Sequence, residues 1–165
     1  MLQQMYPQVF HDYEYELNKD MQFAAAHFVP HTEAGKCRQV HGHTYFVNLT
    51  VAGDTLDEAG FLVNFALLKK IVSGQFDHTL LNDHSIFNEE NPNDFPTTEV
   101  VARKIYELVQ EYLDTLPNKP SCVQVFVRET PTSYVVYRPK KVKNVANTIP
   151  VLEIFGPTIQ GKEWL

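Results

Sequence analysis

Two histidines and a cysteine lie close together in the segment GKCRQVHGHTYFVNLTV, which spans residues 35–51. The residues that follow the histidines are rich in β-branched and aromatic types, so the sequence predicts a strand that begins at the histidines. Side chains two positions apart on a strand point to the same face, with α-carbons roughly 7 Å apart. His41 and His43 can therefore converge on one metal ion.

A third imidazole for such a site is available on the preceding extended segment. His27 lies near the end of that segment, and an antiparallel hairpin would bring it beside the His-x-His pair. Three histidines and a water make an open zinc site of the catalytic type. The alternative is that these imidazoles are ordinary surface or core residues, and the residues alone leave both interpretations open. A cupin-type site is disfavoured because no glutamate occurs between Thr44 and Ala52.

The two cysteines differ in their surroundings. Cys37 lies four positions before His41, so even an extended chain keeps the two residues within roughly 13 Å. Its thiol can therefore share the pocket without ligating the ion. Its neighbours are Lys36 and Arg38, a polar and cationic setting that is typical of reactive cysteines. Cys122 instead lies in an apolar strand and fits an inert, buried thiol.

Two further groups could take part in proton transfer or binding. Asp77 and His78 are adjacent in FDHTLLN, and a carboxylate can orient an imidazole and stabilise its charged form. Glu129 ends an apolar strand, where it could grip a ring with adjacent N–H donors, as in pterins and guanines, by a bidentate pair. Each has a plain alternative, since Asp-His is common in turns and a strand-end glutamate often faces water.

Hydrophobic periodicity predicts an α+β domain. The predicted strands cover residues 13–29, 41–53, 121–130 and 133–140. The first is expected to break near residues 18–20. A short helix is expected over 65–72 with Gly74 as its C-cap, and a longer helix over 97–116 with Thr97 as its N-cap. The order β-β-α-α-β-β gives an antiparallel four-stranded sheet with two helices on one face. Its two unpaired edges favour an oligomer.

The composition restricts the possible functions. The chain has 165 residues and a formal net charge of −6, which disfavours a general nucleic-acid binder but permits a local anion pocket. No apolar run approaches the length of a membrane span, and the N-terminus lacks the pattern of a secretory signal. We therefore expect one cytoplasmic domain, residues 1–165, with reduced cysteines, a small-molecule substrate, and no nucleic-acid or membrane partner.

Taken together, the motifs resemble one known family. Cys37-x3-His41-Gly42-His43, the upstream AAAHF with His27, FDHTLLN, PTTE and RET occur in the order typical of the 6-pyruvoyl-tetrahydropterin synthase family, which has the tunnelling fold. Each motif is weak by itself, but their joint occurrence is specific. The resemblance covers about residues 14–140 and leaves a C-terminal tail, 141–165, that departs from the compact family pattern.

The resemblance implies roles for individual residues. The zinc ligands of the family correspond to His27, His41 and His43. Its catalytic triad corresponds to Cys37, Asp77 and His78. Its pterin-binding residues correspond to Glu129 and, in PTTE, Thr98. The family assembles as a dimer of trimers, so the resemblance also implies a homohexamer with sites between subunits.

The spacing of the cysteine motif favours one activity within the family. Animal pyruvoyl enzymes resemble Cys-x5-His-Gly-His, whereas bacterial 6-carboxy-tetrahydropterin synthases of queuosine biosynthesis resemble Cys-x3-His-Gly-His, as in this chain. The implied reaction is the conversion of dihydroneopterin triphosphate to 6-carboxy-5,6,7,8-tetrahydropterin, with release of acetaldehyde and triphosphate. Two alternatives stay open. One is a pyruvoyl product or folate-type side-chain cleavage in the same pocket, and the other is a non-catalytic module that binds pterin or zinc.

Overall fold

The structure is a computed structural model that describes residues 6–140. Residues 1–5 and the predicted tail, 141–165, lie outside the described residues. The strands are β1 (Tyr15–His27), β2 (His41–Gly53), β3 (Thr79–Leu80), β4 (Ser121–Thr130) and β5 (Ser133–Tyr137). The α-helices are α1 (Phe65–Phe76) and α2 (Thr98–Thr115), and short 3-10 helices are η1 (Thr32–Arg38), η2 (Leu81–Asp83) and η3 (Pro92–Asp94).

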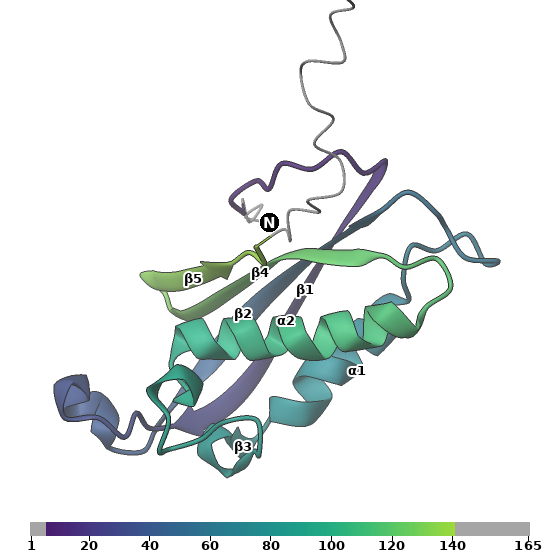
Figure 1. Cartoon of the computed structure of the whole chain (residues 1–165). Helices are drawn as coiled ribbons and strands as arrows, with labels where there is room; N and C mark the ends of the chain where they lie inside the picture. The colour runs from purple at the N-terminus through teal and green to yellow at the C-terminus, as the bar shows by residue number, and fades with distance from the viewer. Residues whose placement is uncertain (1–5, 141–165) are drawn as a thin grey trace, which may run out of the picture.

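The described strands form one sheet in the order β3-β1-β2-β4-β5 (Figure 1). The β1–β2, β2–β4 and β4–β5 pairs are antiparallel, as predicted, whereas β3 runs parallel to β1 through Ala25–Thr79 and Ala26–Leu80. The α+β class is thus confirmed, but the sheet is mixed and has five strands instead of four. The fifth was missed because a two-residue strand inside a polar loop has no periodic pattern.

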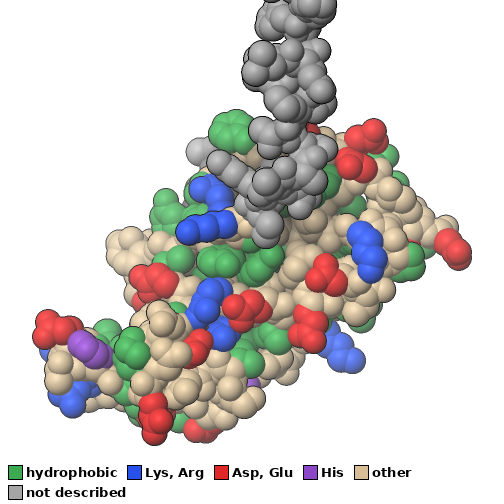
Figure 2. All heavy atoms as spheres, viewed as in Figure 1, with side chains coloured by type: hydrophobic (Ala, Val, Ile, Leu, Met, Phe, Trp, Pro, Cys, Tyr) green, Lys and Arg blue, Asp and Glu red, His purple; other side chains and the backbone are tan. Residues whose placement is uncertain are grey.

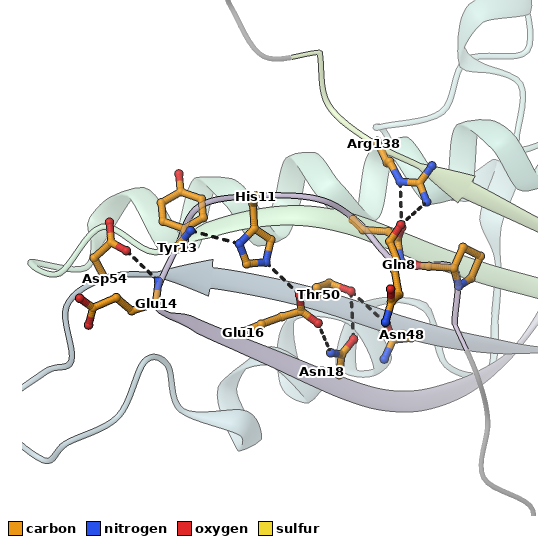
Figure 3. A network of polar contacts seen from close by, with 12 residues as sticks. Gln8, His11, Tyr13, Glu14, Glu16, Asn18, Asn48, Thr50, Asp54 and Arg138 are labelled. Atoms are coloured by element: carbon orange, nitrogen blue, oxygen red, sulfur yellow. Dashed lines mark hydrogen bonds and ion pairs between the residues drawn. The ribbon is translucent and has the colours of Figure 1, made fainter.

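The first strand is continuous through its polar middle, so the predicted break near residues 18–20 is wrong. Asn18 and Asp20 share one face of β1 and contact polar partners on β2. Thr50 Oγ1 donates to Asn18 Oδ1 at 3.0 Å, and Asn48 Nδ2 donates to Asp20 Oδ1 at 2.9 Å. Figure 3 shows Asn18, Asn48 and Thr50 in this polar network on neighbouring strands. Cross-strand hydrogen bonds therefore keep polar residues in the strand.

The two α-helices cover the opposite face of the sheet, as predicted (Figure 1). Thr97 caps α2 by accepting a hydrogen bond from the Val100 amide, which confirms the expected N-cap. The first helix continues past Gly74 to Phe76, so the predicted C-cap is wrong. Phe76 is fully buried and its ring lies 5.5 Å from that of Phe23, so apolar packing extends the helix by two residues beyond the glycine.

The N-terminal segment crosses the sheet face that the helices leave uncovered. Gln124 Nε2 donates to the Pro7 carbonyl at 2.9 Å. Arg138 Nη2 donates to the Gln8 carbonyl at 3.3 Å, and Figure 3 shows these two residues side by side. The Tyr6 ring also contacts Phe126 edge-on, with centroids 5.0 Å apart. These contacts satisfy the buried amide of Gln124.

The surface of the helical face carries both signs of charge. Figure 2 shows acidic and basic side chains interspersed over this face, with no broad basic area among the residues it colours. Between residues 6 and 140, no helix is both long and apolar enough to cross a membrane.

Candidate functional site

The three predicted histidines meet at one end of the β1–β2 hairpin. The register pairs His27 directly with His41, and His43 lies two residues further along β2. The ring centroids are 4.5 Å apart for His27–His41, 5.3 Å for His27–His43 and 4.9 Å for His41–His43. One candidate ligand atom from each ring lies within 4.8 Å of the other two. The predicted meeting of the three imidazoles is therefore present in the structure.

Backbone carbonyls fix the tautomers of two of these rings. His27 Nδ1 lies 2.6 Å from the Pro96 carbonyl oxygen, and His41 Nδ1 lies 2.8 Å from that of Gln39. A carbonyl only accepts, so each Nδ1 carries the proton and each Nε2 keeps a free lone pair. This orientation by a backbone carbonyl is common in histidine ligands of metals.

The remaining ring nitrogens fit a metal ion. The Nε2 atoms of His27 and His43 are buried and have no hydrogen-bond partner among the described residues. Burial lowers the pKa of His27, although the hydrogen bond to Pro96 and the nearby Glu129 act in the opposite direction, so burial favours the neutral ring. Unpaired buried lone pairs are costly, and a divalent cation would satisfy them.

Glu129 lies beside the imidazoles. Its Oε1 is 3.4 Å from His27 Nε2 and 3.6 Å from His43 Nε2. The β4–β5 register shifts between Arg128 and Thr130, so Glu129 lies at an irregularity of the β-bulge kind. Bulges commonly re-aim a side chain near a functional site, and here the carboxylate points at the histidine cluster.

Tyr45 lies at the site, although no sequence motif indicated it. The residue is fully buried, and its ring centroid lies 6.0 Å from that of His27 and 5.7 Å from that of His43. Its buried hydroxyl has no hydrogen-bond partner among the described residues. Burial raises the pKa of Tyr45, and Glu129 and Cys37 raise it further. The signal was its spacing, because Tyr45 follows His43 by two positions and so shares its face.

Cys37 and Thr98 line the same depression as His27 and Glu129. Cys37 lies in η1 and is exposed. A hydrogen bond of 2.8 Å from the Val29 amide to the Cys37 carbonyl holds this segment beside the end of β1. Cys37, Thr98, His27 and Glu129 are among the residues that line the depression, whose volume is about 310 Å³. Four of the predicted site residues are thus brought together.

Cys122 is the buried thiol that the sequence predicts. Its side chain belongs to the core, and burial raises its pKa to about 12. It therefore stays protonated and unreactive at neutral pH.

Asp77 and His78 do not line the depression that contains Cys37. Asp77 Oδ1 accepts a hydrogen bond from the Ala24 amide at 2.8 Å, and the His78 amide donates to the Ala24 carbonyl at 2.6 Å. His78 adopts a left-handed backbone with φ of 58°, and its Nε2 lies 3.7 Å from Asp77 Oδ2. The imidazole is 85% exposed, and His78 and His43 line a depression that does not include Cys37. One chain alone therefore does not assemble the predicted triad.

Comparisons with known proteins show the family of this chain. Residues 16–140 match the family described as 6-pyruvoyl tetrahydropterin synthase. The chain is 67% identical over 141 residues to the 6-carboxy-5,6,7,8-tetrahydropterin synthase of Bacillus subtilis, covering 86% of this chain and 97% of that protein. It is 36% identical over 127 residues to the Synechocystis protein of the same name, covering 72% and 89%.

A solved structure extends the agreement to the fold. The 6-pyruvoyl tetrahydropterin synthase of Caenorhabditis elegans superposes with a TM-score of 0.60 at 26% identity, covering 76% of this chain and 95% of that one. Fold, motifs and sequence identity thus lead to the same assignment. The chain is an enzyme of the 6-pyruvoyl tetrahydropterin synthase family, which is a family of lyases.

Proposed function

We propose that this enzyme converts 7,8-dihydroneopterin triphosphate to 6-carboxy-5,6,7,8-tetrahydropterin in the cytoplasm, as an early step towards queuosine. Acetaldehyde and triphosphate are the other products. The observation that carries the proposal is the cluster of three imidazoles beside Glu129. One of these imidazoles, His27, lines a depression together with Glu129 and Cys37. The choice of product is supported by the Cys-x3-His-Gly-His spacing and by the name of the Bacillus subtilis relative.

We infer that His27, His41 and His43 hold Zn²⁺. The unpaired Nε2 atoms of His27 and His43 support this assignment, because imidazole nitrogen is a favoured zinc ligand. When bound there, zinc supplies a Lewis acid that polarises substrate oxygens and makes adjacent C–H protons more acidic.

The side chains around the depression then bind the substrate and move protons. The Glu129 carboxylate accepts hydrogen bonds from the N–H groups of the pterin ring, and Thr98 contacts the same ring. The Cys37 thiolate removes a proton from the substrate side chain. His78, oriented by Asp77, returns a proton elsewhere on that side chain.

The triphosphate needs cations near the substrate. Lys36 and Arg38 flank Cys37 in the last turn of η1, which makes them the first candidates. Arg128 is a weaker candidate, because its guanidinium group already contacts another side chain. The guanidinium carbon lies 5.5 Å from the centroid of the Phe126 ring, over which it is placed. Substitution of each cation, followed by measurement of KM, would distinguish them.

We propose further that the active enzyme is a homohexamer, a dimer of trimers, with sites completed between subunits. Cys37 and His78 line separate depressions of one chain, so a second subunit would be needed to bring the Cys37 thiol and the His78 imidazole together. Among residues 6–140, β5 has β4 as its strand partner on one side, and the other edge of β1 is paired over Ala25 and Ala26. Open edges of this kind favour strand pairing with another copy.

Mass spectrometry of the products tests the proposal. The zinc-loaded protein is incubated with dihydroneopterin triphosphate, and the expected products are 6-carboxy-tetrahydropterin and acetaldehyde. A pyruvoyl product would assign the chain to the sister reaction named for the Caenorhabditis elegans structure. An unchanged substrate with zinc bound would favour a non-catalytic pterin- or metal-binding module.

A further inference from the structure

We propose that Glu129 is a fourth metal ligand in the substrate-free enzyme, and that pterin binding withdraws it. The carboxylate would thus close the metal site at rest and open it when substrate arrives. This inference rests on the proposed metal site and on the proposed role of Glu129 in holding the pterin ring.

The distances from Glu129 match a tetrahedral site. Two ligands of one tetrahedral ion, each bonded at about 2.0–2.1 Å, lie roughly 3.3–3.4 Å apart. Glu129 Oε1 lies 3.4 Å from His27 Nε2 and 3.6 Å from His43 Nε2. The oxygen is therefore close to the separation that a shared ion requires. Carboxylate oxygen is also an accepted zinc ligand.

The surroundings of Glu129 leave its carboxylate directed at the metal site. The register irregularity between Arg128 and Thr130 turns the side chain towards the histidines. The fully buried Tyr45 lies close to the Glu129 carboxylate. The negative charge of Glu129 contributes to the raised pKa of the Tyr45 hydroxyl. The Glu129 side chain is 21% exposed, so a ligand in the depression can still reach it.

The Glu129 carboxylate cannot bind the pterin ring through both oxygens and the metal ion at the same time. A bidentate grip on adjacent N–H groups of a pterin uses both carboxylate oxygens, and a metal bond uses one of them. Binding of the ring therefore competes with ligation of the metal. The site changes from a closed set of four protein ligands, which resembles structural zinc, to an open set of three, which resembles catalytic zinc.

Cobalt substitution tests this inference without measuring activity. The metal-free protein is titrated with Co²⁺, whose visible absorption depends on the number and type of its ligands. Three variants are compared with the wild type: Glu129→Gln, Glu129→Asp, and the control Glu99→Gln, which removes an exposed carboxylate from the same depression. Circular dichroism verifies that each variant is folded.

We expect Glu129→Gln to change the Co²⁺ absorption and to weaken Co²⁺ binding about 10-fold or more. Glu129→Asp should behave in the same way, because its carboxylate is one methylene shorter, whereas Glu99→Gln should match the wild type. Neopterin, whose fluorescence reports its own binding, should shift the absorption of the wild-type Co²⁺ protein.

Several results would overturn the inference. One is Co²⁺ binding with superimposable spectra in wild type and Glu129→Gln, which would leave the three-histidine metal site intact. Another is full affinity in Glu129→Asp, which would mean that charge attraction acts instead of ligation. A third is neopterin binding without a change in absorption. Failure of the wild type to bind Co²⁺ would instead refute the metal centre of the proposed function, and the inference with it.

Discussion

Replacement of Cys37 by alanine gives the sharpest test of the proposed chemistry. A positioned proton-transfer group contributes about 10²–10⁴-fold to a rate, so the variant should lose about that factor, or roughly 2.7–5.5 kcal/mol of transition-state stabilisation. The fold should not change, because the thiol is exposed and the backbone carbonyl of Cys37 makes the contact with Val29. The unfolding free energy should therefore stay within about 0.5 kcal/mol of the wild type.

The assay is turnover of dihydroneopterin triphosphate, together with zinc content and the unfolding free energy of the same preparations. Cys122→Ala is the matched control, because it removes the other thiol from the core. It should lower stability by roughly 0.5–1.5 kcal/mol, as small core truncations do, and leave turnover unchanged below the unfolding temperature. Near-full turnover in Cys37→Ala, with zinc bound, would refute the assigned role.

Three further predictions follow from the geometry. Iodoacetamide should label Cys37 in the native protein and leave Cys122, which has a pKa of about 12, unlabelled, as peptide mass spectrometry would reveal. Burial lowers the pKa of His27 from 6.5, so unfolding takes up a proton, and the unfolding free energy of the metal-free protein should fall as pH drops below 6.5, measured by urea denaturation. Asp77→Asn keeps an acceptor for the strand amide but removes the charge beside His78, so the fold should persist while turnover falls about 10²-fold.

Local patterns predicted the parts of the fold that repeat. Period-two alternation gave β2, and helical spacing gave α2 with Thr97 as its N-cap. The cluster of three histidines followed from the same reasoning, because an antiparallel hairpin whose first strand ends at His27 and whose second begins at His41 pairs those two residues. These predictions succeed because each depends on residues close together in the sequence or in one hairpin.

The features that the sequence did not predict depend on distant contacts. The Pro96 carbonyl that orients His27 comes from a loop 69 positions away. The two-residue strand Thr79–Leu80 is defined by its pairing with β1, which is more than fifty positions earlier in the sequence. The direction of Glu129 depends on the register between β4 and β5, which no local pattern specifies.

The backbone of His78 is held beside β1, which fixes the position of Asp77 and His78 in the chain. A left-handed conformation is uncommon for a non-glycine residue, and it persists where surrounding contacts hold it. Here Ala24 provides them, since its amide and carbonyl bond the Asp77 carboxylate and the His78 amide. The clamp fixes the backbone, yet the imidazole stays 85% exposed. An exposed imidazole on a fixed backbone is poorly placed for chemistry within one chain, but it agrees with our proposal that His78 completes the pocket of a neighbouring subunit.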